Sequence, residues 1–142
     1  MIYGKKMNSQ ELKNYIPHRE PMLLINNVEL GSDGMSHGVY EVKGDEWFLQ
    51  GHFPDMPIVP GVIQCEMLAQ SSCMLLLENI KGRTPMFGGL DNIRFKKPVR
   101  PGDKIELICK LKKVRDPFYF VSGKGLVDGQ ICVSGDFFFV LI

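Results

Sequence analysis

Between residues 62 and 79 nearly every position is apolar or small, and this run has no regular polar positions. A helix at a protein surface carries a broad polar face, which this stretch lacks. At 1.5 Å per residue, roughly eighteen residues form a helix about 27 Å long. The pattern therefore predicts one long helix buried at the centre of the molecule.

Strand-like runs, rich in β-branched and aromatic residues, lie on both sides of that helix. We expect strands over residues 22–30, 35–43, 86–99, 104–114, 118–127 and 130–141. Near the N-terminus, Asn8-Ser9-Gln10-Glu11 resembles a capping box that opens a short helix through about Tyr15. Six strands and one long apolar helix predict an α+β fold, in which a six-stranded antiparallel sheet wraps around the helix.

The composition agrees with an ordinary globular domain. The chain has 142 residues, of which 44% are hydrophobic and 23% charged, and its net charge is +1. No apolar run approaches the ~20 residues of a membrane-spanning helix, and residues 1–10 lack the apolar core of a signal peptide. We therefore expect one domain over residues 1–142, located in the cytoplasm and without a membrane partner.

The four cysteines are more typical of core residues than of reactive or metal-binding ones. They show neither the Cys-x-x-Cys spacing nor the Cys/His clustering that zinc sites need. Cys65 adjoins Glu66, but neighbours in a helix point about 100° apart, which disfavours a nucleophilic pair. We expect no metal site and no catalytic cysteine.

The least ordinary chemistry of the chain lies just before the apolar run, in residues 51–62. Three prolines at every third position predict a stiff, polyproline-like path, with Pro60 as the first helical residue. Glu66 is almost the only charge in the apolar helix, where a carboxylate is either a structural acceptor or a tuned acid or base. His52 brings imidazole, the usual general base near neutral pH. His52 and Glu66 are therefore the candidate catalytic groups.

The order Gly51-His52-Phe53-Pro54, Pro57, Pro60-Gly61-Val62 and Glu66 resembles the active-site signature of FabZ-type 3-hydroxyacyl-acyl-carrier-protein dehydratases. These enzymes have the hotdog fold. Residues 16–25, Ile-Pro-His-Arg-Glu-Pro-Met-Leu-Leu-Ile, resemble the family's opening Pro-His-Arg segment. Residues 94–103 resemble its Phe-x-x-Pro-Val-x-Pro-Gly-Asp turn, so the similarity covers most of the chain.

The resemblance implies the reversible dehydration of a (3R)-3-hydroxyacyl thioester to a trans-2-enoyl thioester and water, with no metal, nicotinamide or flavin. His52 would remove the C2 proton while its ring is held by the carbonyl of Ile58, and Glu66 would help the 3-hydroxyl leave. Backbone N–H groups at the start of the helix would polarise the thioester carbonyl. The substrate-binding residues expected from the resemblance are Phe53, Ile58, Gly61 and Val62.

The resemblance also implies partners. In the family the histidine of one subunit faces the carboxylate of the other, so a homodimer is expected, and a trimer of dimers is common among relatives. Between residues 94 and 115, nine basic side chains stand against two acidic ones. They form either a solvated strand face or a landing site for an anionic partner, here acyl carrier protein bearing a 3-hydroxyacyl chain. Nucleic acid is disfavoured, because no recognition motif accompanies the basic run.

Several positions depart from the family pattern. Asp55 and Met56 replace the Gly-His that frequently follows His-Phe-Pro, and Glu20 stands where an aromatic residue often gates the acyl tunnel. His18 has no partner visible in the sequence, and we favour a structural role for it. These departures leave the preferred chain length open.

Two other functions remain alternatives. A hotdog thioesterase would hydrolyse the thioester instead, and a non-catalytic protein would only bind an acyl chain or its carrier. The presence of both His52 and Glu66 disfavours both alternatives.

Overall fold

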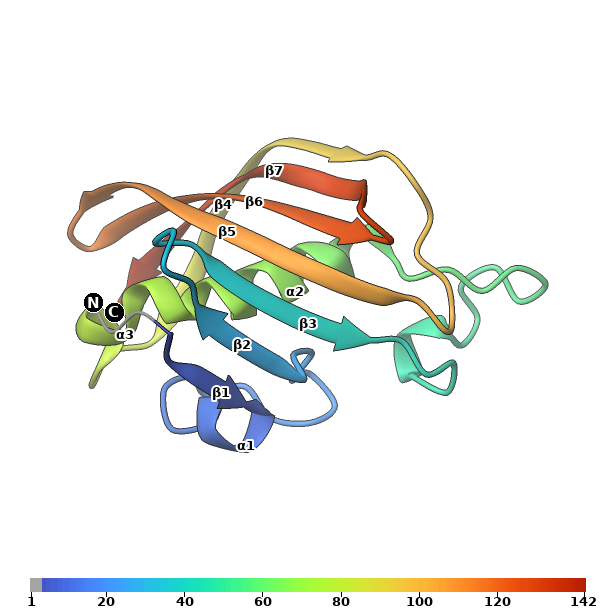
Figure 1. The fold of residues 1–142 in the computed structure, drawn as a ribbon, viewed down its shortest axis with the longest axis horizontal. Coiled ribbons are helices and arrows are strands. Elements are labelled where there is room, and N and C mark those ends of the chain that lie inside the picture. Colours follow the sequence, from blue (N-terminus) through green and yellow to red (C-terminus); the bar gives the residue numbers. More distant parts are fainter. Residues whose placement is uncertain (1–3) are drawn as a thin grey trace.

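A computed structural model describes residues 4–142 and shows one antiparallel sheet of seven strands curled around a helix (Figure 1). The strands follow the order β1-β2-β3-β5-β6-β7-β4 across the sheet. Their bounds are β1 Lys6–Asn8, β2 Asn27–Leu30, β3 Ser36–Glu41, β4 Pro85–Phe95, β5 Lys104–Arg115, β6 Phe118–Val127 and β7 Gln130–Leu141. A 3-10 turn, Trp47–Leu49, follows β3.

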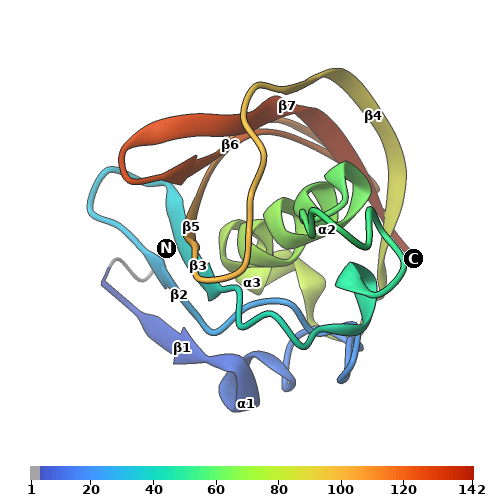
Figure 2. The same cartoon turned by 90° about the vertical axis from the view of Figure 1, so that its right-hand side faces the viewer.

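The buried central helix predicted from the apolar run is confirmed, although its backbone geometry changes along its length. It begins as α2, Gly61–Ser72, tightens into a 3-10 turn at Cys73–Leu76, and ends as α3, Leu77–Ile80. Figure 2 shows the curved sheet enclosing it. No helix within residues 4–142 is long and apolar enough to cross a membrane.

The helix lies directly against the sheet where it crosses β3. A Cβ atom added to Gly38 would stand only 2.6 Å from the Cβ of Ser71, so any larger residue there would collide with α2. Ser71 is fully buried, and its hydroxyl donates to the carbonyl of Leu68 at 3.1 Å. Gly38 therefore sets how closely the helix approaches the sheet.

The sheet has one strand more than the six we predicted. The additional strand, β1, pairs with β2 and has only three residues, too few to show a period in the sequence. The predicted capping box follows it: the Asn8 side chain accepts from the Glu11 N–H at 2.9 Å, and the Glu11 carboxylate accepts from the Asn8 N–H at 3.2 Å. The helix that it caps, α1, is short, Ser9–Leu12.

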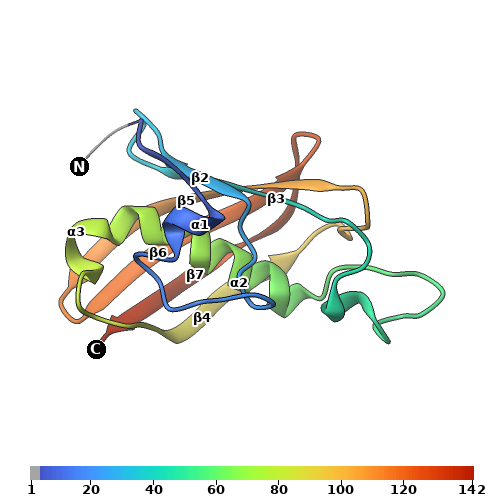
Figure 3. The same ribbon diagram turned by 90° about the horizontal axis from the view of Figure 1, so that it is seen from below.

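Only the last part of the strand predicted over residues 22–30 joins the sheet, as β2. The backbone before it bonds to the central helix instead. The Leu24 N–H donates to Gln70 Oε1, and the Met22 carbonyl accepts from Gln70 Nε2, both at 2.7 Å. These bonds replace a strand ladder, and Figure 3 shows this segment crossing α2 on the side away from the sheet.

The strand predicted over residues 86–99 also ends early, because β4 stops at Phe95. Beyond it the chain leaves the sheet, and the Val99 carbonyl accepts from the Val59 N–H at 2.7 Å. Since β4 is the last strand in the sheet order, one of its edges is free. Exposed apolar side chains on β4 are Met86, Phe87, Leu90 and Phe95. Such an edge is typical of a surface that pairs with another chain.

Candidate active site

His52 lies near the start of the loop, residues 51–60, that leads into α2. Its Nδ1 atom is 3.0 Å from the carbonyl oxygen of Ile58, the contact that the resemblance implied. Because a carbonyl can only accept, Nδ1 carries the hydrogen and donates it. The lone pair is then on Nε2, which leaves that atom able to accept a proton.

The spacing of the prolines predicted a polyproline-like path for the whole loop, but only part of the loop can follow one. Its first part is a turn, closed by a 2.8 Å hydrogen bond from the Met56 N–H to the Phe53 carbonyl. Phe53 has φ 54°, a left-handed conformation that is costly for a residue with a side chain. Its ring centroid lies 4.5 Å from that of His52. The strained turn thus brings an aromatic ring against the imidazole.

The start of α2 supplies hydrogen-bond donors beside this loop. Pro60 is the N-cap rather than the first helical residue, and its carbonyl accepts from the N–H groups of Ile63 and Gln64 at 3.0 and 3.2 Å. The N–H groups of Gly61 and Val62 come earlier in the helix and have no intrahelical acceptor. Together with the positive end of the helix dipole, they can stabilise a negatively charged oxygen.

One pocket gathers five of the six predicted site residues. It has a volume of about 540 Å³ and is lined by His52 and all four predicted substrate-binding residues, Phe53, Ile58, Gly61 and Val62. Phe95, at the end of β4, contributes to the other wall, and a Cβ atom on Gly61 would lie 2.5 Å from its ring. Glycine at position 61 therefore lets the end of β4 pack on the start of the helix.

Glu66, the sixth predicted residue, faces a different cavity. It follows Gly61 by five residues, which turns its side chain roughly 140° around the helix and moves it ~7.5 Å along the axis. The cavity measures about 240 Å³, and its lining includes His18, Gln70 and the β4 residues 85–87. The structure of one chain therefore does not bring His52 and Glu66 into the same pocket.

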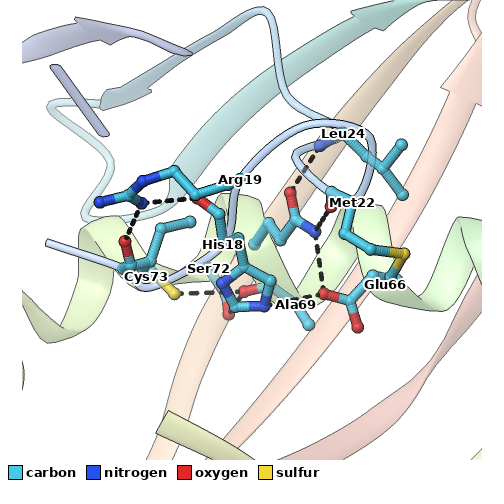
Figure 4. A network of polar contacts seen from close by, with 10 residues as sticks. His18, Arg19, Met22, Leu24, Glu66, Ala69, Ser72 and Cys73 are labelled. Carbon is cyan, nitrogen blue, oxygen red and sulfur yellow. Dashed lines mark hydrogen bonds and ion pairs between the residues drawn. The ribbon is translucent and has the colours of Figure 1, made fainter. Parts of the chain in front are cut away.

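Within residues 4–142, two side chains make polar contacts with the Glu66 carboxylate, and both reach the same oxygen (Figure 4). Gln70 Nε2 donates to Glu66 Oε2 at 2.9 Å, and His18 Nε2 lies 3.2 Å from that atom. The Glu66 side chain is 19% exposed, so these contacts form in a partly desolvated place. The spacing of Glu66 and Gln70, four residues on a helix, was visible in the sequence. The approach of His18 was not, because it depends on how the segment before β2 crosses the helix.

His18 and His52 differ in what their ring nitrogens can do. The Nε2 of His18 is engaged by Glu66, and its Nδ1 is buried without a hydrogen-bond partner. Neither nitrogen of His18 is free to reach a substrate, whereas His52 Nε2 has no partner among the described residues and lies beside a pocket. Of the two, His52 is the one suited to act as a base.

Cys73 lines the Glu66 cavity but is poorly suited to be a nucleophile. Burial, with a smaller effect of the Glu66 charge, raises the pKa of its thiol to about 12. Burial likewise raises the pKa of Cys65. A thiol that stays protonated is a weak nucleophile. Within residues 4–142, no group of three or more His, Cys, Asp or Glu side chains is arranged to hold a metal ion.

Three of the residues that depart from the family pattern, Glu20, Asp55 and Met56, lie outside both cavities, whereas a fourth, Gln64, lines the His52 pocket. Glu20 is exposed, and its carboxylate pairs with Lys13 Nζ at 2.8 Å, which lowers its pKa. Asp55 and Met56 are exposed in the turn that follows His52. Among the described residues none of these three lines the pocket of His52 or the cavity of Glu66.

Six of the nine basic residues in the run 94–115 form two groups in the structure. Lys96 and Lys97 line the His52 pocket. The second group lies in the second half of β5 and consists of Lys110, Lys112, Lys113 and Arg115. Lys112 lies 3.5 Å from Asp136, and Lys113 lies over the ring of Phe120. Only the first group stands beside the candidate site.

An antiparallel sheet curled around one long buried helix is the arrangement of the hotdog class of proteins. Residues 16–136 match the family model described as a FabA-like domain, so the chain belongs to this family.

Curated relatives point to one branch of the family. The chain is 41% identical over 140 residues to 3-hydroxyacyl-acyl-carrier-protein dehydratase FabZ of Clostridium beijerinckii, covering 95% of this chain and 99% of the relative. It is 40% identical over 134 residues to FabZ of Staphylococcus haemolyticus, with 92% of each covered. Among solved structures, the dehydratase heterocomplex ApeI:P of Xenorhabdus doucetiae matches with a TM-score of 0.78 and 22% identity, over 92% of this chain and 90% of that one. This last likeness shows the fold.

Proposed function

We propose that the protein catalyses the reversible dehydration of (3R)-3-hydroxyacyl groups on acyl carrier protein, giving trans-2-enoyl groups and water, in the synthesis of fatty acids or related acyl chains. One observation carries the proposal: within residues 4–142, the Nε2 of His52 and the N–H groups of Gly61 and Val62 have no hydrogen-bond partner, and all three residues line the same pocket. The ~40% identity to curated FabZ dehydratases supports it. Residues 1–142 would act as one domain, and a cytoplasmic location stays a prediction.

The dehydration needs a base at C2, an acid at the 3-hydroxyl and stabilisation of the thioester oxygen. In the proposed reaction His52 Nε2 takes the C2 proton, and the helix N–H groups of Gly61 and Val62 stabilise the enolate-like oxygen. As the C3–O bond breaks, Glu66 gives a proton to the departing hydroxide and water forms. His52 then holds one proton more and Glu66 one fewer, and transfer between them through water restores both groups.

The reaction needs Glu66 and His52 to act on the same substrate. The position of β4 suggests how two chains together could provide both groups. The two half-sites on one chain border opposite ends of β4: the Glu66 cavity includes Phe87, and the His52 pocket includes Phe95. Phe87 and Phe95 are eight residues apart along β4, so each half-site of one chain lies at its own end of this strand.

Antiparallel pairing of two β4 strands about a two-fold axis near Leu90 would remove that separation. The Phe95 end of one strand would then lie beside the Phe87 end of the partner strand, because Leu90 is the midpoint of Pro85–Phe95. The free edge and the exposed apolar side chains of β4 fit such an interface. We therefore propose a homodimer in which His52 faces Glu66 of the partner subunit.

The acyl carrier protein would approach from the side of Lys96 and Lys97. Both line the His52 pocket, and their charges would attract an acidic carrier. The more distant basic group on β5 would contribute less, since exposed charges are screened within about 10 Å in ordinary salt. Assembly of three dimers stays a prediction.

The test is the enoyl absorbance formed from 3-hydroxybutyryl and 3-hydroxydecanoyl groups on acyl carrier protein. We expect turnover by the wild type and a loss of about 10²–10⁴-fold in each of His52→Ala and Glu66→Ala. His37→Ala is the matched control, because His37 also pairs with a carboxylate, that of Asp33 at 2.8 Å, but lies on β3, outside both cavities.

The same reactions distinguish the alternatives. A thioesterase would release free acid and thiol from the same substrates, so the carrier thiol is measured alongside the enoyl group. A well-folded protein that formed neither product from any carrier-bound chain would contradict the dehydratase proposal and favour a binding function.

A further inference from the structure

The two oxygens of the Glu66 carboxylate are not equivalent. Both contacts to it, from Gln70 and from His18, end on Oε2. Figure 4 shows the other oxygen, Oε1, pointing away from these partners. Within residues 4–142, Oε2 is thus held by two protein groups and Oε1 by none, in a side chain that lines a cavity.

The orientation of the Gln70 amide is fixed by backbone groups. Its Oε1 accepts from the Leu24 N–H, and its Nε2 donates to the Met22 carbonyl, both at 2.7 Å. A flipped amide would set donor against donor at Leu24 and acceptor against acceptor at Met22. The remaining N–H of Gln70, which is 1% exposed, must therefore donate to Glu66 Oε2.

His18 must donate to the same oxygen. His18 Nε2 bears the hydrogen of the 3.2 Å contact whenever Oε2 is ionised or is the carbonyl oxygen of the acid, and the reverse direction, from an Oε2 hydroxyl, would require the hydrogen of a neutral ring to sit on Nδ1. The His18 Nδ1 atom is buried with no hydrogen-bond partner. An unprotonated Nδ1 is the less costly state there, since a buried N–H without an acceptor is strongly disfavoured.

We propose that His18 and Gln70 are positioning residues that reserve Oε2 of Glu66 as an acceptor and thereby make Oε1 the atom that exchanges a proton with the 3-hydroxyl. This inference rests on the proposed function. When Glu66 releases its proton, negative charge grows on the carboxylate, and the two donors at Oε2 stabilise it in a partly desolvated place. Their contribution is therefore larger in the transition state than before it.

Substitutions at His18 test the positioning role through kcat and KM. His18→Ala should lower kcat by about tenfold to a hundredfold, the usual effect of losing one hydrogen bond to a charged group, with KM nearly unchanged. His18→Gln offers an amide N–H in place of Nε2–H and should restore most of the rate. His37→Ala, another histidine paired with a carboxylate, should leave kcat at the wild-type value.

A double variant separates positioning from general support of the fold. If His18 acts through Glu66, then His18→Ala should cost nothing further in a Glu66→Ala background, because the oxygen it holds is gone. Multiplying losses, with intact folding shown by circular dichroism, would overturn the inference. So would a wild-type kcat in His18→Ala while Glu66→Ala is inactive, a result that leaves the dehydratase proposal standing.

A measurement without substrate tests the inference even if the chain does not dehydrate. Nitrogen-15 NMR of labelled histidine reports which ring nitrogen carries the hydrogen. We expect the Nε2–H tautomer for His18, with the Nδ1 signal of an unprotonated nitrogen, and a changed Nε2–H shift in Glu66→Ala. A His18 ring protonated on Nδ1 alone would overturn the inference.

Discussion

At the scale of single residues, Arg83 ties the start of β4 to the turn between β5 and β6. It donates two hydrogen bonds of 2.9 Å to the carboxylate of Asp116 and a third to the carbonyl of Leu141. The hydroxyl of Tyr119 donates to the same carboxylate at 2.7 Å. The hydrogen bonds from Arg83, and then the one from Tyr119, lower the pKa of Asp116 from 3.8 to about 2.

The lowered pKa of Asp116 predicts a pH dependence of stability. Because the folded pKa lies below the unfolded one, the ionised carboxylate stabilises the fold above pH ~4, and this contribution is lost as the pH falls toward ~2. In Arg83→Gln, an NMR titration of Asp116 should show its pKa rising toward 3.8. Lys6→Gln, which removes an exposed partner of Glu29, is the control and should leave the Asp116 titration near 2. An unchanged Asp116 titration in Arg83→Gln would contradict this account.

The contrast between His52 and His18 shows what the sequence allows one to predict at this scale. The bond between His52 and Ile58 spans six residues of a proline-rich loop, and its motif was enough to predict it. His18 meets Glu66 across 48 residues of chain, through a segment whose backbone is bonded to Gln70 rather than to a strand. Hydrophobic periodicity contains no information on such a crossing, so the partner of His18 could not be predicted.

At the scale of elements, the contact between β3 and α2 depends on a missing side chain. Gly38→Ala would place a Cβ atom 2.6 Å from that of Ser71, and overpacking a core typically costs about 1–3 kcal/mol. We expect urea unfolding of Gly38→Ala to show a fall in the free energy of unfolding of that order. The effect should come with a displaced helix, and hence with a displaced Glu66.

A second substitution gives the internal control for this packing prediction. Ser71→Gly removes the atom that the new methyl group meets, so the double variant should lose less stability than the two single variants added together. Additive losses would show that Gly38 matters for its own backbone conformation and not for the approach of the helix.

The elements that the sequence predicted well are those with a strong period or a strong motif. The central helix, the strands β3, β5, β6 and β7, and the capping box at Asn8 all had such signals. The differences arise where side chains of other elements satisfy the backbone. Gln70 does so at Met22 and Leu24, where a strand was expected, and the three-residue β1 is too short for any period.

At the scale of the whole molecule, His52 and Glu66 line different cavities of one chain, so the proposed active site would be completed only across the proposed dimer. In a two-fold dimer of the proposed kind, each site takes His52 from one chain and Glu66 from the partner subunit. Substitutions of these residues on different chains should therefore complement one another. The two inactive variants, His52→Ala and Glu66→Ala, provide the test.

Mixing, unfolding and refolding the two variants together should give heterodimers as half of the dimers. Each heterodimer has one site with both substitutions and one site with both native residues, so about a quarter of the wild-type activity should return. Each variant refolded alone is the control and should stay inactive. If both groups of one chain served the same site, no native site could form in the mixture and no activity would return. Adding Leu90→Arg to both chains should abolish the recovery, since two like charges would then meet near the proposed axis.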